Sequence, residues 1–304
     1  SSPDLLAHVS ETLAGRVALH ELGTLKANEI SQKPLSLLYS LLESGGDLME
    51  LAHQDAPLTQ EEIHRAWFLG GYPEPVLSED SLFYQQWMDN YRQTYVNRDV
   101  AQLFPRLNKQ AYQRFLSVLS KLSGTILNRR DIARSIEVTE GSIRTYLDIA
   151  EGTFMWRALP SFEKNVIKSV VKMPKGFIRD SGLLHHLLHI KTFDQLISSP
   201  EIGRSFESFV IEELLKGLEA TRLTHWSPHY YRTRNGAEID LILEGVNGSI
   251  PIEIKYSATL TKKQLIALNT FIEEHQLDFG VVLNQSRHVA WVAPKVLQIP
   301  VTWI

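Results

Sequence analysis

Three charged residues, Asp240, Glu253 and Lys255, have types and a spacing that could hydrolyse a phosphodiester bond. Two carboxylates on neighbouring strands of a hairpin can bind one divalent cation, and Mg²⁺ is satisfied by a few carboxylates together with water and phosphate oxygens. The adjacent lysine can orient or help deprotonate the attacking water and offset phosphate charge. The pattern predicts a Mg²⁺-dependent site. The alternative is an amphipathic hairpin whose solvent-exposed face carries these charges by chance.

The alternation of apolar residues predicts the strands that position this trio. In the expected strand 250–256, Ile250, Ile252 and Ile254 point one way. Glu253 and Lys255 therefore share the opposite face. Further strands are expected at 230–234, 238–243, 279–284 and near 289–292, with a helix at 261–276. Another helix is expected at 205–218, with Ser205 as its N-cap. These elements predict an α/β unit.

A basic segment precedes this unit. Residues 106–175 contain 13 Lys and Arg against 6 Asp and Glu, although the whole chain has a net charge of −4. Such an island is typical of proteins that bind a phosphate backbone, and a solvated surface without a partner is the alternative. The charge pattern predicts DNA as the partner.

Within the island, residues 128–136 and 139–152 predict a helix, a tight turn and a second helix that begins at Thr139. The outer face of the second helix would present Thr139, Ser142 and Arg144 to a major groove, with Arg129 and Arg130 nearby. Apolar segments at 154–162 and 168–177, the second with a Pro-Lys-Gly turn, complete a predicted winged helix-turn-helix. A helical module that only joins domains is the alternative.

Composition excludes several other classes of protein. Hydrophobic residues make up 43% and charged residues 22%, which is a globular balance rather than a disordered one. No apolar run reaches the roughly 18 residues that a membrane helix needs. The absence of cysteine excludes thiol nucleophiles and cysteine-ligated zinc, and it fits a cytoplasmic protein with no membrane partner. His185 and His189 are four residues apart, but without a third ligand they favour ordinary histidines over zinc.

Residues 201–256 resemble the PD-(D/E)XK nuclease pattern, in which Glu207 would join Asp240, Glu253 and Lys255. Almost the whole chain also resembles prokaryotic AAA-type ATPases with a C-terminal DUF4143 domain. The matching stretches are 11–16, 70–77, 91–100, 172–183 and 203–213. By this resemblance Asp240 and Glu253 would bind the metal, with Glu207 as a supporting group, and a homo-oligomer is compatible with the family.

The resemblance divides the chain into three parts. Residues 1–75 would be the end and lid of an ATPase core, 76–180 a helical linker and winged helix-turn-helix, and 181–304 a nuclease-like domain. The expected class is therefore an α+β multidomain protein. No glycine precedes a lysine anywhere, so the phosphate-binding motif G-x-x-x-x-G-K-[ST] is missing and ATP is expected only in an intact family member. The function expected is that of a DNA-acting nuclease, or alternatively of a non-catalytic DNA-binding or protein-interaction module.

Overall fold

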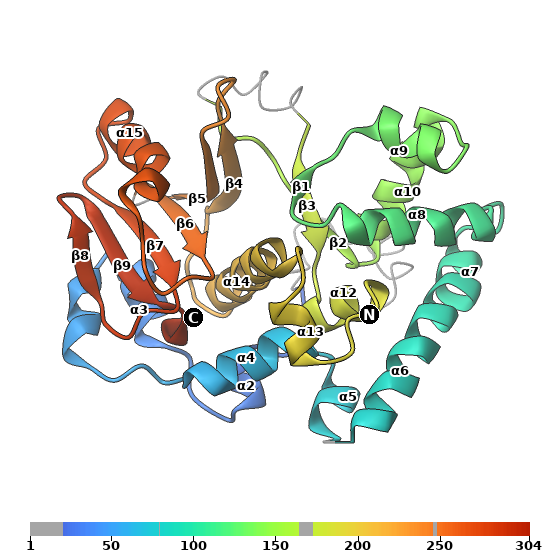
Figure 1. Ribbon diagram of the computed structural model, residues 1–304, viewed down its shortest axis with the longest axis horizontal. Helices are drawn as coiled ribbons and strands as arrows, with labels where there is room; N and C mark the ends of the chain where they lie inside the picture. The colour runs from blue at the N-terminus through green and yellow to red at the C-terminus, as the bar shows by residue number, and fades with distance from the viewer. Residues whose placement is uncertain (1–20, 79, 164–172, 246–247) are drawn as a thin grey trace, which may run out of the picture.

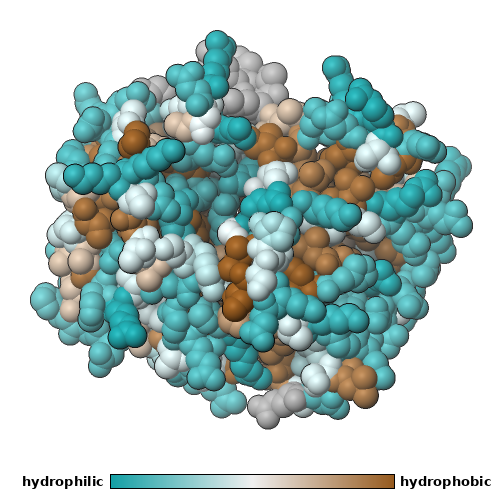
Figure 2. Space-filling view, viewed as in Figure 1, coloured by the Kyte–Doolittle hydropathy of each residue, from teal (hydrophilic) through white to brown (hydrophobic). Residues whose placement is uncertain are grey.

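The computed structural model describes residues 21–304 except 79, 164–172 and 246–247, and shows a mixed α and β protein with two sheets (Figure 1). The stretch 11–16 of the family resemblance lies outside these residues. Throughout the described ranges, no helix is both long and apolar enough to span a bilayer. Hydrophilic side chains cover most of the face shown in Figure 2, with apolar side chains in small groups between them.

The larger sheet has six strands in the order β4-β5-β6-β7-β9-β8. Strands β4 to β6 form an antiparallel meander, β7 and β9 add parallel strands, and β8 closes the far edge antiparallel to β9. The bounds are β4 (Ser227–Arg232), β5 (Glu238–Gly245), β6 (Gly248–Lys255), β7 (Gly280–Asn284), β8 (Ala290–Ala293) and β9 (Val296–Pro300). The meander and the crossover to β7 confirm the predicted α/β unit.

Helices cover both faces of this sheet. One face packs against α14 (Ile202–Glu219), whose apolar residues share a core with Leu241, Ile252 and Ile254. The other face packs against α15 (Ile266–Glu274), which follows the 3₁₀ helix η3 (Lys262–Leu265) and shares a second core with Ile242. Burial on two sides fixes the register of the central strands, because a one-residue slip would exchange their faces.

The N-terminal helices pack below α14 and the large sheet and contribute to the same core (Figure 1). They are α2 (Ala27–Ile30), α3 (Leu37–Ser44), η1 (Leu48–His53) and α4 (Gln60–Leu69). The backbone N–H of Leu58 donates to the carbonyl of Thr302, beside the last 3₁₀ turn η4 (Val301–Trp303). Residues that are far apart in the sequence are thereby joined in one core.

The second region holds the basic segment and has a core of its own. Its helices are α6 (Ser81–Thr94), the π-helix η2 (Tyr95–Val100), α7 (Ala101–Leu103), α8 (Lys109–Lys121), α9 (Arg129–Ser135), α10 (Glu140–Gly152) and α12 (Ser181–Leu187). A three-stranded antiparallel sheet lies beside them, in the order β1 (Thr125–Ile126), β3 (Lys175–Ile178) and β2 (Trp156–Leu159). Two short helices, α5 (Pro73–Leu77) and α13 (Phe193–Ile197), pack into the first core through Val76 and Leu196. The Thr139 hydroxyl accepts from the backbone N–H of Ser142, which confirms Thr139 as the N-cap of α10.

Two glycine-containing segments meet where the two regions join. The Asp180 carboxylate accepts from the backbone N–H of Gly71 at 2.8 Å and of Leu183 at 2.8 Å. A Cβ atom at Gly182 would lie 2.0 Å from the carbonyl oxygen of Leu69, so no larger residue fits without movement. The stretches 70–77 and 172–183 of the family resemblance therefore have a structural role at this joint.

Three details differ from the expectations. Helix α14 begins at Ile202, and Ser205 is a buried residue inside it rather than its cap. Strand β9 was not expected. The prediction of a turn at Pro-Lys-Gly is wrong, because Lys175 and Gly176 belong to β3 and pair with Leu159 and Ala158. The first half of the expected segment 168–177 lies outside the described residues.

Candidate functional site

Asp240 and Glu253 lie beside each other where the β5–β6 ladder ends. The last paired residues there are Leu241 and Ile252, so Asp240 and Glu253 are next in line on the two strands. Instead of a further backbone pair, the Asp240 Oδ2 atom accepts from the backbone N–H of Ile254 at 2.8 Å. This hydrogen bond holds the Asp240 carboxylate against the strand that carries Glu253 and Lys255.

Lys255 joins the two carboxylates. Its Nζ atom lies 2.5 Å from Glu253 Oε1 and 3.6 Å from Asp240 Oδ2. Both acidic side chains are 8% exposed, whereas Lys255 is 26% exposed and reaches the surface. The predicted trio is thus brought together on one side of the hairpin, with the lysine on its solvent side.

Lys175 is a fourth member of the cluster that sequence reasoning did not identify. Its Nζ atom lies 2.6 Å from Glu207 Oε1, 2.8 Å from Glu238 Oε1 and 3.7 Å from Asp240 Oδ1. The side chain is only 3% exposed. Because Lys175 begins β3 of the small sheet, it carries a positive charge from one region into the acidic cluster of the other, and it links Glu207 on α14 to Asp240.

Carboxyl groups outnumber ammonium groups in this cluster. Glu207, Glu238, Asp240 and Glu253 surround Lys175 and Lys255. Burial, followed by the charge of Asp240, raises the pKa of Glu207 and of Glu253 to about 8 each. Burial alone would lower the pKa values of Lys175 and Lys255, but the surrounding carboxylates outweigh it and hold both above the ordinary value.

One oxygen of this cluster has no partner among the described residues. Glu253 Oε2 is buried and makes no hydrogen bond to any of them, and a buried carboxyl oxygen left in this way is costly. Among the same residues, no three acidic or histidine side chains are arranged as a ready metal cage. The carboxylate oxygen donors nevertheless fit Mg²⁺, which needs only one or two protein carboxylates.

The histidines that suggested zinc are placed apart. His185 lies in α12, is buried, and bonds to the carbonyl of Phe68 at 2.9 Å and to the Ser205 hydroxyl at 2.7 Å. His189 lies beyond the end of α12 with a positive φ of 60°. The two histidines therefore do not share a helix face.

The residues expected to contact DNA lie on α9 and α10, away from the acidic cluster. In Figure 1, the small sheet stands between these helices and β5–β6. The Thr139 and Ser142 hydroxyls lie 2.9 Å apart, and both belong to the start of α10. Their main contacts therefore stabilise the helix end.

The arginines of this surface are more available. Arg129 and Arg130 lie 3.9 and 3.2 Å from the carboxylate of Glu140, and their side chains are 45% and 80% exposed. Exposed pairs of this kind contribute little stability and exchange readily with another anion. Arg144 is exposed and, within the part of the chain that the structure describes, forms no ion pair.

The chain was compared with known proteins. Residues 60–194 match the model "Domain of unknown function (DUF8612)", and residues 202–304 match "Domain of unknown function (DUF4143)". Over 300 residues, which is 99% of this chain, it is 32% identical to the uncharacterized protein Rv2008c of Mycobacterium tuberculosis and to the uncharacterized protein Mb2031c of Mycobacterium bovis. The chain spans 60% of the length of these curated relatives. No solved structure matches it. Residues 202–304, which carry Glu207, Asp240, Glu253 and Lys255, are therefore a C-terminal DUF4143 domain.

Proposed function

We propose that the DUF4143 domain of this chain is nuclease-like and hydrolyses phosphodiester bonds of DNA with the help of Mg²⁺. The observation that carries the proposal is the convergence of carboxylates from α14, β5 and β6 on two lysines, with Glu253 Oε2 lacking a hydrogen-bond partner among the described residues. Carboxylates gathered this closely repel one another when they ionise, and a divalent cation would relieve that repulsion.

Asp240 and Glu253 are the residues that would hold the metal, and Glu207 would support it from α14. When bound, Mg²⁺ would stabilise negative charge on phosphate oxygens and lower the pKa of a coordinated water. The hydrogen bond from Ile254 keeps the Asp240 carboxylate in a fixed orientation. Lys255 reaches the surface and would orient the attacking water and offset phosphate charge.

DNA binding would involve a second surface, on α9 and α10, which we propose act as part of a winged helix-turn-helix. Support comes from the predicted N-cap, the basic composition of residues 106–175 and the exposure of Arg130 and Arg144. Phosphate contacts from such arginines contribute affinity and salt dependence rather than sequence preference. The link to AAA-type ATPases is part of the same proposal, and this chain alone is not expected to bind ATP.

One observation favours a second candidate function. Lys175 is nearly inaccessible, and its ammonium group already bridges the carboxylates of Glu207 and Asp240. It therefore occupies part of the position that a metal ion bound to these carboxylates would take. A domain in which this lysine permanently replaces the metal would be a non-catalytic DNA-binding or protein-interaction module. The two functions differ in whether a divalent cation can displace the Lys175 ammonium.

Cleavage of supercoiled plasmid and of single-stranded DNA, with Mg²⁺ or with chelator, tests the proposal. We expect cleavage only with the metal, and we expect Asp240→Asn to abolish it while keeping the fold, because asparagine retains an oxygen for the N–H of Ile254. Glu244→Gln is a matched control, since Glu244 lies on the same strand but is 51% exposed and pairs with His229. DNA binding without cleavage under every metal condition would favour the non-catalytic module.

A further inference from the structure

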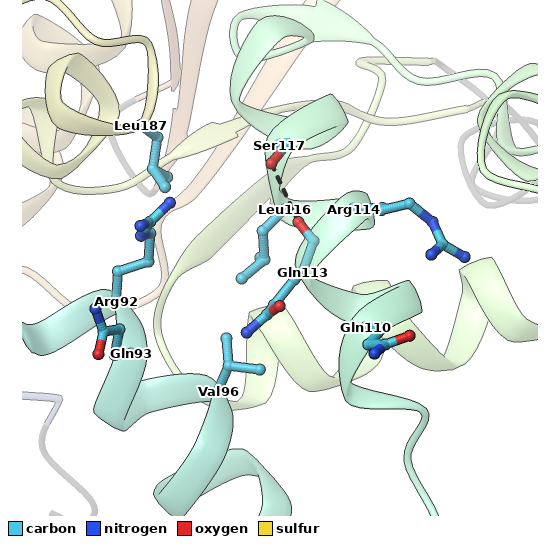
Figure 3. A pocket seen from close by; sticks show the side chains of 9 residues that line it. All are labelled: Arg92, Gln93, Val96, Gln110, Gln113, Arg114, Leu116, Ser117 and Leu187. Carbon is cyan, nitrogen blue, oxygen red and sulfur yellow. Dashed lines mark hydrogen bonds between the residues drawn. The ribbon is translucent and has the colours of Figure 1, made fainter. Parts of the chain in front are cut away.

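A cavity of about 460 Å³ lies in the other region of the molecule, between the end of α6 and helix α8, with Leu187 of α12 at its edge (Figure 3). It shares no residue with the acidic cluster and none with the arginines proposed to contact DNA. Cavities of this size accommodate small organic ligands. The chemistry of its walls therefore indicates what it could bind, independently of the proposed nuclease function.

The charged groups that line the cavity in the described part of the chain are all positive. They are Arg92 and Arg114, and no described acidic side chain lines it. Figure 3 shows Arg92 extending toward Leu187 across the space between the helices, whereas Arg114 points to the far side of α8. Among the described residues, Arg92 pairs with Asp89, at 3.8 Å and half-exposed, and Asp89 lies closer to His186 at 3.2 Å. Within that part of the chain Arg92 is thus only weakly paired, so its guanidinium can bind an anion.

Three amide side chains provide donors and acceptors beside this cation. They belong to Gln93, Gln110 and Gln113, and no hydrogen bond between described residues uses their amide groups. In Figure 3 the Gln113 amide points toward Val96, into the space between the helices. An amide can pair with a nucleobase edge through one donor and one acceptor, as glutamine does with adenine.

An apolar wall completes the cavity. Val96 and Leu116 are buried, and Leu187 is half-buried. Val96 belongs to the π-helix η2, which directly continues α6 and so sets the position of Arg92 and Gln93 relative to α8. Single π-helical turns are rare and occur often at functional sites.

We propose that this cavity binds a mononucleotide, with its phosphate at Arg92 and its base between the apolar wall and the Gln113 amide. Inorganic phosphate would fill only a small part of the volume and would leave the amides unused. A nucleoside would lack the charge that Arg92 attracts. The combination of one cation, several amides and an apolar wall fits a ligand that has both parts.

Calorimetry with the full chain tests this, using AMP, GMP, CMP and UMP as probes, with inorganic phosphate, adenosine and a 12-nucleotide single strand for comparison. We expect at least one mononucleotide to bind with 1:1 stoichiometry and at least about tenfold more tightly than phosphate or adenosine. Arg92→Gln and Gln113→Ala should each weaken binding about tenfold, since each removes one specific contact. Both residues are exposed, so the variants should keep the wild-type melting temperature.

Arg106→Gln is the matched control, because Arg106 is an exposed arginine near α8 that does not line this cavity. It should leave mononucleotide binding unchanged. Three results would overturn the proposal: no mononucleotide binding at millimolar concentration, binding that Arg92→Gln and Gln113→Ala do not weaken, or binding of the single strand alone. The last would make the cavity part of a nucleic-acid path instead.

Discussion

Two of the buried charge clusters on helix α14 differ in how well their charges are compensated. At one, Glu213 lies 2.6 Å from Lys216 and 3.4 Å from Lys26, and also accepts from the backbone N–H of Ala27 at 2.9 Å. At the other, Glu207 shares Lys175 with Asp240. One cluster has a lysine on each side of its carboxylate, whereas the other has carboxylates on both sides of a lysine.

The pKa values follow this difference. Burial alone would raise the pKa of Glu213, but Lys216 and Lys26 outweigh it and leave the pKa below its ordinary value. Burial and Asp240 instead raise the pKa of Glu207 to about 8. Buried charge is therefore not in itself the mark of a functional site. An excess of carboxyl groups over lysines, with two raised pKa values and an oxygen that has no partner among the described residues, distinguishes the cluster at Asp240 and Glu253.

The largest effect is expected from removing the compensated carboxylate. Glu213→Gln should destabilise the protein by about 3 to 5 kcal/mol, because it leaves Lys26 and Lys216 without their buried partner. Asp240→Asn should change stability by less than about 1 kcal/mol, because it also relieves repulsion with the neighbouring carboxylates. Denaturant unfolding measures both. Equal losses would mean that the two clusters have the same structural role.

Removing the shared lysine should have the next largest effect. Lys175→Met should cost about 2 to 3 kcal/mol without divalent metal, because Glu207 and Asp240 lose their common counterion. Mg²⁺ should restore part of that stability by binding the folded state. The melting temperature of Lys175→Met, measured with and without Mg²⁺, tests this. A melting temperature that Mg²⁺ does not raise would support the non-catalytic module.

The dependence of stability on pH should separate the clusters as well. The folded-state pKa of Glu253 is about 8, above the ordinary 4.5, so the folded protein binds more protons between these values and loses stability as pH rises from about 4.5 to 8. Glu253→Gln should flatten this fall by at least about 1 kcal/mol. Urea unfolding at pH 5 and pH 8 is the measurement, with Glu244→Gln as control. A wild-type stability that rises over this interval, with no difference in Glu253→Gln, would refute the assignment.

The smallest effect on stability is expected at the exposed basic helices. Replacing Arg129, Arg130 and Arg144 together by Ala should change stability by less than about 0.5 kcal/mol for each residue. It should instead flatten the log–log salt dependence of DNA binding by about 2 to 3 units, since each lost phosphate contact removes about 0.9. Fluorescence anisotropy at several salt concentrations measures the slope, and an unchanged slope would place the DNA surface elsewhere.

The sequence predicted the hairpin and its charged trio because alternation is a local signal. Every second residue of β6 enters a core, which leaves Glu253 and Lys255 on the other side. Lys175 could not be found in this way. Its partner Glu238 is 63 residues away, and Pro174 beside it suggested a turn instead of a strand. The local sequence predicts Ser205 as a helix cap. Its hydroxyl instead forms hydrogen bonds with Trp67 and His185, which lie on other helices and which a local pattern does not reveal.

Calorimetric titration of Mn²⁺ or Mg²⁺ into the wild-type protein and Asp240→Asn at pH 8 tests the central claim, that the cluster of Glu207, Asp240 and Glu253 is a metal site. We predict one bound ion per chain in the wild type, with protons released because binding favours the ionised carboxylates, and no binding in Asp240→Asn. Wild-type protein that binds no divalent ion, or binds it equally well after Asp240→Asn, would contradict the claim.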